Sequence, residues 1–377
     1  MRATVLGDPA LAKHAGRFAW LSIDAENARN AAFTDRVALD GYPTFLVIDA
    51  ATEQVALRWY GSLTVEQFER LLDDGERAVA ASGPSPAESA LARADRLGAE
   101  KKFVEAARGY AEALRLAPDG WVRRGRAVES LIFSLRKADD LEGCASVSRQ
   151  EAPRLERGPS FANSAATGLS CALDGPEDAP WRAGALAALE PLVRESLTLE
   201  DVLADDRSGC YEMLVNFRKE RDDEAGAKEL AETWLSFLEA EAGKAADPET
   251  RAAFDSHRVA AALALGDPAR SVPALLASER DLPEDYNPPA RLAVLYRELG
   301  RFEEALAATE RGLARAYGPR KLRIYDTRAD VFMKMGDATA AKRTIEEALR
   351  YAAELPASQQ PDRLIEQLKK KIASAGG

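Results

Sequence analysis

The sequence predicts a mostly α-helical protein, a helical-repeat solenoid of stacked helix pairs preceded by a partial α/β domain. Three observations support this fold class. Aromatic residues make up only 7% of the 377 residues, and the abundant alanine suits thin layers of closely packed helices. The turn-forming glycines Gly266, Gly300 and Gly336 recur at separations of 34 and 36 residues, which is the length of a helix–turn–helix repeat. Runs of β-branched and aromatic residues that indicate strands lie before Gly61.

The composition argues against several classes of function. The net charge of −11 at pH 7 repels a phosphate backbone, and we find no cluster of Lys and Arg with interleaved aromatics, so no nucleic acid partner is expected. No apolar run approaches the roughly 18 residues that span a bilayer, and residues 1–20 lack the pattern of an export signal. The sequence therefore predicts no membrane insertion and, by default, a soluble cytoplasmic protein.

Residues suited to catalysis are scarce. The histidines are His14 and His257, and phosphate-loop, nucleophile-elbow, zinc-helix and dinucleotide fingerprints are absent from the sequence. Cys144, Cys171 and Cys210 lie 27 and 39 positions apart in helical tracts, a spacing that indicates neither a disulfide framework nor a zinc site. We expect them to be buried as small apolar residues. No cofactor, metal site or enzymatic activity is predicted for the chain as it stands.

The first 80 residues predict a short α/β segment. Its elements are a strand at 18–24, a helix at 26–39, a strand at 43–49, a strand at 54–60 and a helix after Thr64. The apolar run of the second strand suits burial on both faces, and its short connection to the third favours an antiparallel hairpin. Thr64-x-x-Gln67 is typical of a capping box that opens the last helix.

This order of elements, with Tyr42-Pro43-Thr44-Phe45 at the start of the second strand, resembles the C-terminal two-thirds of a thioredoxin-like domain. The resemblance covers about residues 1–80. In that family the proline is cis, and its loop faces the redox cysteines and helps to bind substrate chains. The resemblance therefore implies a cis-proline loop at Tyr42, Pro43 and Thr44. A plain strand-start proline in another α/β fold is the alternative.

The match lacks the family's first strand and its Trp-Cys-x-x-Cys turn. In the family's sheet that strand lies between those matching 18–24 and 43–49, so its loss would leave backbone groups unpaired. Two explanations are open: a start codon placed too late, or a decayed domain whose gap is closed by packing on the repeats. The thioredoxin-like module of this chain is expected to be redox-inactive.

Helical periodicity takes over after residues 82–86, which are predicted to link the partial domain at 1–81 to the repeats. Ala94, Tyr110 and Pro118 fall on the pattern of the tetratricopeptide repeat, in which small residues lie where paired helices touch. The chain resembles that family over 87–356. The clearest repeats are 87–118, 252–283, 286–319 and 322–356, residues 119–250 indicate degenerate helix pairs, and 357–377 indicates a C-terminal capping helix.

Stacked helix pairs leave a concave groove that binds extended peptides or helices. Residues of first helices that could line the groove are Arg291, Tyr296, Arg323, Tyr325 and Arg328. The resemblance implies a protein-interaction scaffold or adaptor with a protein or peptide partner. The alternative is a thioredoxin-family thiol-disulfide oxidoreductase whose Cys-x-x-Cys segment lies upstream of Met1.

Overall fold

The computed structural model describes residues 5–37, 39, 41–80 and 85–375. The chain forms two compact units. Unit 1 comprises Met1–Ala19 and Val37–Trp234, and unit 2 comprises Trp20–Arg36 and Leu235–Gly377. Among the described residues, each helix is either too short or too polar to span a bilayer.

Unit 1 contains a small antiparallel hairpin of β1 (Thr44–Ile48) and β2 (Val55–Tyr60). Phe45 pairs with Trp59 and Val47 pairs with Leu57, so these apolar side chains share one face. That face packs on the long helix α2 (Val65–Ala80). The predicted capping box opens this helix, because the Thr64 and Gln67 side chains each accept a hydrogen bond from the other's backbone N–H.

The opposite face of the hairpin packs on the helices that follow it. The ring of Tyr60 lies 3.8 Å from that of Phe133 in α5 (Arg124–Lys137). The Arg58 guanidinium donates a 2.7 Å hydrogen bond to the carbonyl of Gly98 in α3 (Pro86–Ala99). Helices therefore pack on both faces of β2, which joins the hairpin to the repeat-like helices of unit 1.

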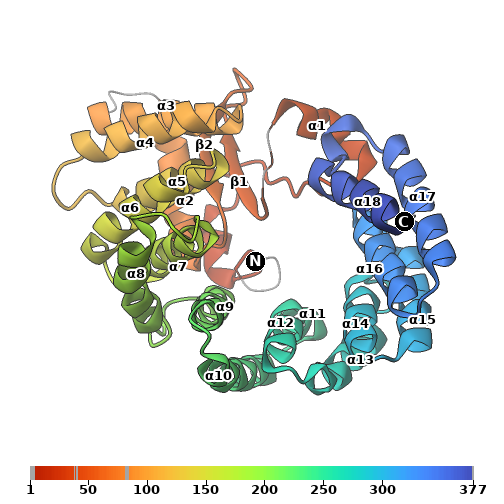
Figure 1. Ribbon diagram of the computed structural model, residues 1–377. Helices are drawn as coiled ribbons and strands as arrows, with labels where there is room; N and C mark the ends of the chain where they lie inside the picture. Colours follow the sequence, from red (N-terminus) through yellow and green to blue (C-terminus); the bar gives the residue numbers. More distant parts are fainter. Residues whose placement is uncertain (1–4, 38, 40, 81–84, 376–377) are drawn as a thin grey trace. The chain divides into compact units, whose positions relative to one another are not determined.

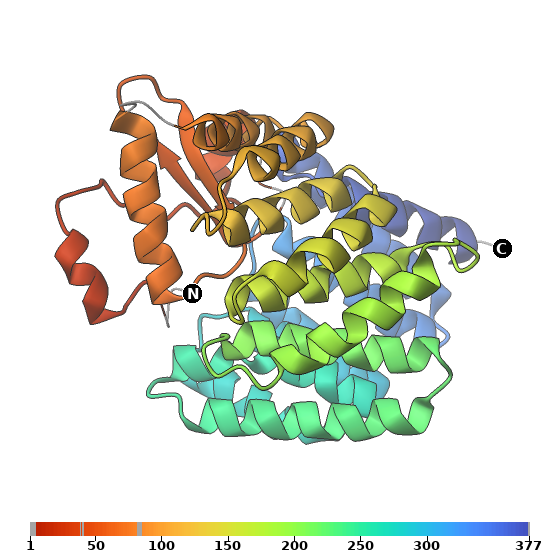
Figure 2. The same cartoon turned by 90° about the vertical axis from the view of Figure 1, so that its left-hand side faces the viewer.

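The remainder of unit 1 is a series of helices, each packed against the next. After α3 come α4 (Phe103–Leu116), α5, α6 (Leu141–Glu151), α7 (Pro159–Asp174), α8 (Arg182–Ser196), α9 (Ala204–Glu220) and α10 (Glu224–Gly243), which continues into unit 2; short 3₁₀ turns are η1 (Pro9–His14) and η3 (Ala152–Arg154). Figure 2 shows the yellow and green helices side by side. Small residues permit close approach: a Cβ added to Gly109 would lie 2.9 Å from that of Ala94.

Unit 2 combines a short N-terminal stretch with the last helices of the chain (Figure 1). Its elements are η2 (Ala28–Asn30), α1 (Ala31–Arg36), α11 (Pro248–Ala252), α12 (Asp255–Leu265), η4 (Pro268–Ser271), α13 (Val272–Asp281), α14 (Asn287–Glu298), α15 (Phe302–Arg315), α16 (Arg320–Lys334), α17 (Ala338–Glu354), η5 (Ala357–Gln359) and α18 (Asp362–Ala375). The two helices of the pair α14–α15 pack against each other, as do those of the pair α16–α17, and α15 packs on α16.

One backbone motif recurs where paired helices join. Gly266, Gly300 and Gly336 have φ of +82°, +71° and +79°, as the repeat pattern predicts. In unit 1 the same position is held by Lys101, Asp139 and Asp222, with φ of +60°, +62° and +55°. In each case the N–H of the next residue bonds to a carbonyl one turn back in the first helix, which is a Schellman closure.

Several sequence predictions for the first 80 residues are wrong in detail. Residues 18–24 form no strand, and the described sheet has two strands. The helix expected over 26–39 is reduced to η2 and the short α1, and residue 38 lies outside the described residues. The strand at 43–49 is not buried on both faces, because Val47 is the one fully buried residue of β1. The five-element thioredoxin-like order is therefore not reproduced. The antiparallel hairpin and the helix after it are confirmed.

The cysteine prediction also requires correction. Cys144 in α6 and Cys171 in α7 form a disulfide with their Cα atoms 6.2 Å apart, whereas Cys210 is free and buried. Sequence spacing did not signal the bond because the two residues meet only when α6 and α7 pack antiparallel. Both cysteines lie in the apolar core of unit 1, so the expected burial is confirmed and the expected absence of a disulfide is wrong.

Candidate functional site

Unit 1 contains a cleft of about 970 Å³. One wall is α2, and the other is made by the connections before α5 and before α7. Its lining includes arginines from all three elements, among them Arg70, Arg123, Arg126, Arg154 and Arg157, together with Trp121 and Val122. The volume lies within the range of ligand-binding pockets. Val122 is 79% exposed at this cleft.

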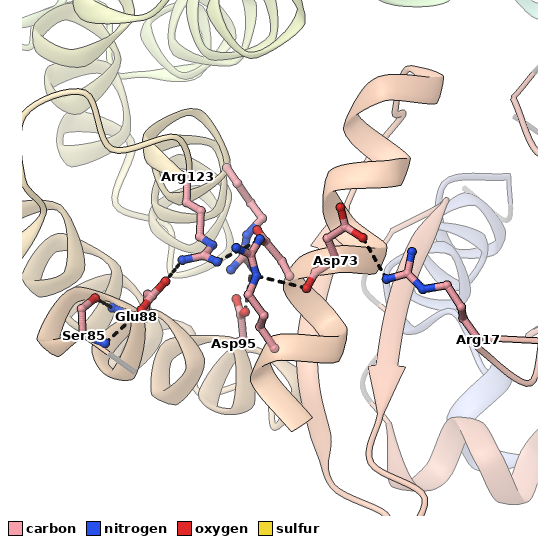
Figure 3. A network of polar contacts seen from close by, with 9 residues as sticks. Arg17, Asp73, Ser85, Glu88, Asp95 and Arg123 are labelled. Atoms are coloured by element: carbon pink, nitrogen blue, oxygen red, sulfur yellow. Dashed lines mark hydrogen bonds and ion pairs between the residues drawn. The ribbon is translucent and has the colours of Figure 1, made fainter. Parts of the chain in front are cut away.

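The arginines of the cleft are held by carboxylates from neighbouring helices. Arg123 contacts Glu88 on one side and lies 2.9 Å from Asp74 of α2 on the other. Figure 3 shows Arg123 directed at Glu88, whose carboxylate also caps the helix that begins after Ser85. On the far side of α2, Arg17 reaches Asp73 at 2.8 Å. Arg123 therefore links α2 to α3, and Arg17 links α2 to the stretch that follows η1.

A buried polar network lies beneath the cleft. Asp95, which is 1% exposed, accepts hydrogen bonds of 2.8 Å from the Tyr110 hydroxyl and from Arg126. Arg126 also donates to the backbone carbonyl of Arg58 in β2. Burial first, and then the charge of Asp95, raises the pKa of Tyr110 well above its usual value. Asp95 therefore ties the hairpin, α3, α4 and α5 together.

Glu129 of α5 is a partly buried acidic residue near the cleft. Its Oε2 lies 3.4 Å from the Asn163 amide, whereas its Oε1 is buried with no hydrogen-bond partner in the described residues. Burial raises the pKa of Glu129 to about 7. This side chain is therefore protonated in part at neutral pH.

The predicted cis-proline loop lies apart from the cleft lining. The Tyr42–Pro43 bond is cis, the isomer that the resemblance implies. Tyr42 is 61% exposed, and the Thr44 hydroxyl donates to the carbonyl of Gly41 at 2.7 Å. The cysteines lie at positions 144, 171 and 210, so the sequence places no cysteine pair near this loop along the chain. Its role in binding stays a prediction.

The five predicted groove residues of unit 2 have different surroundings. Tyr296 is buried in the core, and Arg291 is largely buried, which lowers its pKa. Arg328 donates to the Thr309 hydroxyl at 2.9 Å, and the Tyr325 hydroxyl donates to Glu347 at 2.8 Å. Arg323 is exposed. Their part in partner binding stays a prediction.

Sequence reasoning missed the arginines of the cleft. The run Trp121-Val-Arg-Arg-Gly-Arg126 places three cations beside one aromatic. The search for cation clusters with interleaved aromatics overlooked this short run, which is the signal that could have found the cleft. The carboxylates that neutralise this run come from α2, α3 and α6, which are separated from it in sequence. Their positions follow from the packing alone.

One part of the chain matches a known family. Residues 322–355 match the sequence profile of the tetratricopeptide repeat. No curated protein matches the chain. Among solved structures, a tetratricopeptide repeat protein from Parabacteroides merdae is 12% identical, over 76% of this chain and 98% of its own, with a TM-score of 0.48.

Two further structures are similar at lower scores. The TPR2AB-domain:pHSP90 complex of yeast Sti1 is 19% identical, over 76% of this chain and 98% of its own, with a TM-score of 0.29. A thermophilic tetratricopeptide repeat protein of Thermus thermophilus is 14% identical, over 77% and 98%, with a TM-score of 0.26. These likenesses do not extend to partner or function. The matched residues 322–355 span the helix pair α16–α17, and the chain therefore contains a tetratricopeptide repeat.

Proposed function

We propose that this chain is a protein-interaction scaffold whose principal binding surface is the cleft of unit 1. The observation that carries the proposal is the 970 Å³ cavity lined by arginines, Trp121 and the exposed Val122. Arginine and tryptophan are the residue types that dominate binding energy at protein interfaces. A protein or peptide segment is the partner that suits a cleft of this size and composition.

The walls of the cleft are rigidly supported, which favours binding. Arg123 and Arg126 are 9% and 8% exposed, and each is held by a carboxylate of a different helix. A surface that is already ordered loses little conformational entropy when a partner binds. The proposal includes no catalytic role.

Three helix pairs that begin in unit 1, joined at Lys101, Asp139 and Asp222, share the Schellman closure of the matched repeat. This supports a second element of the proposal, namely that 87–356 is a tetratricopeptide-type array between the partial domain at 1–81 with its linker at 82–86 and the capping segment at 357–377. The groove residues Arg291, Tyr296, Arg323, Tyr325 and Arg328 are proposed as secondary contacts.

Affinity purification of the full chain from extracts of its source cells tests the proposal with two matched variants. Val122→Asp places a charge on the exposed valine of the cleft. Val104→Asp does the same on the outer face of α4, where Val104 is 48% exposed. We expect a specific partner to co-purify with the wild type and with Val104→Asp and to be lost with Val122→Asp. Equal recovery by all three chains, or no partner with any, contradicts the proposal.

A further inference from the structure

Unit 2 holds a segment of the chain's own N-terminal part on its C-terminal helices. Residues 20–27 have no regular secondary structure, and η2 and α1 follow them. The surface that holds residues 24–27 consists of Tyr317, Gly318, Arg320 and Gln359. We call it the Arg320 surface. It lies where α15 is joined to α16 and where η5 follows α17.

Two acidic side chains of the segment meet one arginine. Arg320 lies 3.1 Å from Asp24 and 2.5 Å from Glu26, and the Tyr317 hydroxyl donates to Asp24. The Arg320 guanidinium is itself stacked against the Tyr317 and Tyr286 rings, 4.4 Å and 5.4 Å from their centroids. Partial burial alone would raise the pKa of Asp24, but Tyr317 and Arg320 outweigh it and the pKa is lowered.

The same surface also contacts the backbone of the segment. The Gln359 amide donates to the carbonyls of Ala25, at 2.8 Å, and Asn27, at 3.0 Å. Gly318 has φ of +57°, and a Cβ there would collide with the carbonyl oxygen of Glu26. Backbone contacts of this kind do not depend on the ligand's side chains, so other extended segments can satisfy them.

The segment satisfies this surface only in part. The Oε1 atom of Gln359 is buried and has no hydrogen-bond partner in the described residues, although buried acceptors are nearly always paired. Ala25 is buried, but the apolar residues before it are exposed: Trp20 by 48%, Leu21 by 81% and Ile23 by 39%. Apart from the Gln359 hydrogen bonds, the attachment of residues 24–27 depends on the partly exposed ion pairs of Arg320, and such ion pairs contribute little each.

From this geometry we propose that the Arg320 surface is a docking site for an extended acidic segment of a partner protein, and that residues 24–27 occupy it in cis. The partner segment carries two acids separated by one small residue, the pattern of Asp24-Ala25-Glu26. This inference rests on the proposed scaffold function and assigns a second binding surface. Because the tethered segment competes at high effective concentration, a partner segment must bind with enough affinity, or be present at enough concentration, to displace it.

Fluorescence anisotropy with a labelled peptide that copies residues 20–36 tests the proposal on the full chain. The double variant Asp24→Asn/Glu26→Gln weakens the cis segment, and we expect it to bind the peptide at least about tenfold more tightly than the wild type. A control peptide with Asn and Gln at the two acidic positions should not bind. Adding Arg320→Gln to the double variant should abolish binding, with circular dichroism showing that the fold is kept.

Hydrogen exchange of the wild type supplies a test that needs no substitution. Excess peptide should raise the exchange of amides 20–36 as the cis segment is displaced, and the control peptide should not. The proposal is overturned if the double variant binds both peptides equally, binds neither, or if exchange at 20–36 does not change. Val122→Asp alters the cleft of unit 1 and should leave peptide binding unchanged, so the two proposals fail separately.

Discussion

Asp95 is the residue on which the buried polar network of unit 1 depends. It neutralises Arg126, accepts from Tyr110, and lies with the buried Arg58 between the hairpin and α3. The sequence placed Tyr110 correctly as a packing residue of the repeat pattern. It could not identify Asp95 as buried, because an acid at one helical position looks the same whether its partner is water or an arginine 31 residues away.

Asp95→Asn should destabilise the protein by about 3–5 kcal/mol, because it leaves buried arginines without their carboxylate. Glu66→Gln is the matched control. It removes an exposed carboxylate paired with Arg70, and its effect should stay within about 0.5 kcal/mol. Urea unfolding of the two variants measures both values. A loss no larger for Asp95→Asn than for Glu66→Gln would show that the network is not buried as described.

Glu129 gives a prediction about pH. Its pKa of about 7 in the folded chain exceeds the roughly 4.3 of an unfolded glutamate, so the folded state binds this proton more tightly. The associated stability is present below about pH 4 and is lost as pH rises through 7. Relative to Glu129→Gln, the wild type should lose about 3 kcal/mol between pH 4 and 8. Thermal unfolding across this range checks it, and parallel pH profiles would contradict it.

At the scale of elements, the Schellman closure explains most of the difference between clear and degenerate repeats; the exception is 87–118, which was predicted from its packing residues although Lys101 holds the left-handed position. Where the left-handed position is glycine, as at Gly300 and Gly336, the repeats were predicted with the right spacing. Where Asp139 or Asp222 adopts the same backbone conformation, only a turn signal remained, because aspartate tolerates that conformation but also serves in many other turns. The repeat pattern over 119–250 therefore looks degenerate in part because aspartate replaces glycine at the turns between paired helices.

Gly300→Ala isolates the backbone contribution of this closure. A Cβ at Gly300 would meet no atom within 4 Å, so the expected loss of about 1–2 kcal/mol comes from the left-handed conformation alone. Gly209→Ala is the control, since Gly209 is also sterically open but lies inside α9. There alanine should stabilise by up to about 1 kcal/mol. Effects of the same sign in denaturant unfolding would refute the assignment of the turn.

The disulfide between Cys144 and Cys171 also acts at the scale of elements, because it joins α6 to α7. Cys144 and Cys171 close a loop of 27 residues between α6 and α7, for which chain-entropy arguments give a stabilisation of about 3–4 kcal/mol. Reductant should lower the melting temperature of the wild type. It should have no effect on the Cys144→Ser/Cys171→Ser variant, although Cys210 remains. An unchanged wild-type melting temperature, with reduction confirmed by thiol counting, would argue against the bond.

The strand predicted at 18–24 failed for a reason that appears only in the whole molecule. Alternation signals a strand when one face is buried, but Trp20 and Leu21 are exposed. Residues Trp20–Arg36 belong to unit 2, where Asp24 meets Arg320, which lies almost 300 positions later in the sequence. No local pattern encodes a contact of that separation. The repeat composition and the hairpin were predictable because periodicity and turn chemistry are local properties.

The cleft of unit 1 depends equally on long-range packing. Its arginine run is visible in the sequence, but the wall opposite belongs to α2, which sequence reasoning assigned to a separate domain. Whether a partner occupies this cleft is the central question for the molecule as a whole.

Site-specific photo-crosslinking answers that question most directly. A photoreactive benzoylphenylalanine replaces Val122 in one full-length chain and Val104 in another, and each is irradiated in its source cells. The scaffold account predicts a discrete covalent adduct with another protein at position 122 and none at position 104. Absence of an adduct at 122, or the same adducts at both positions, would contradict it.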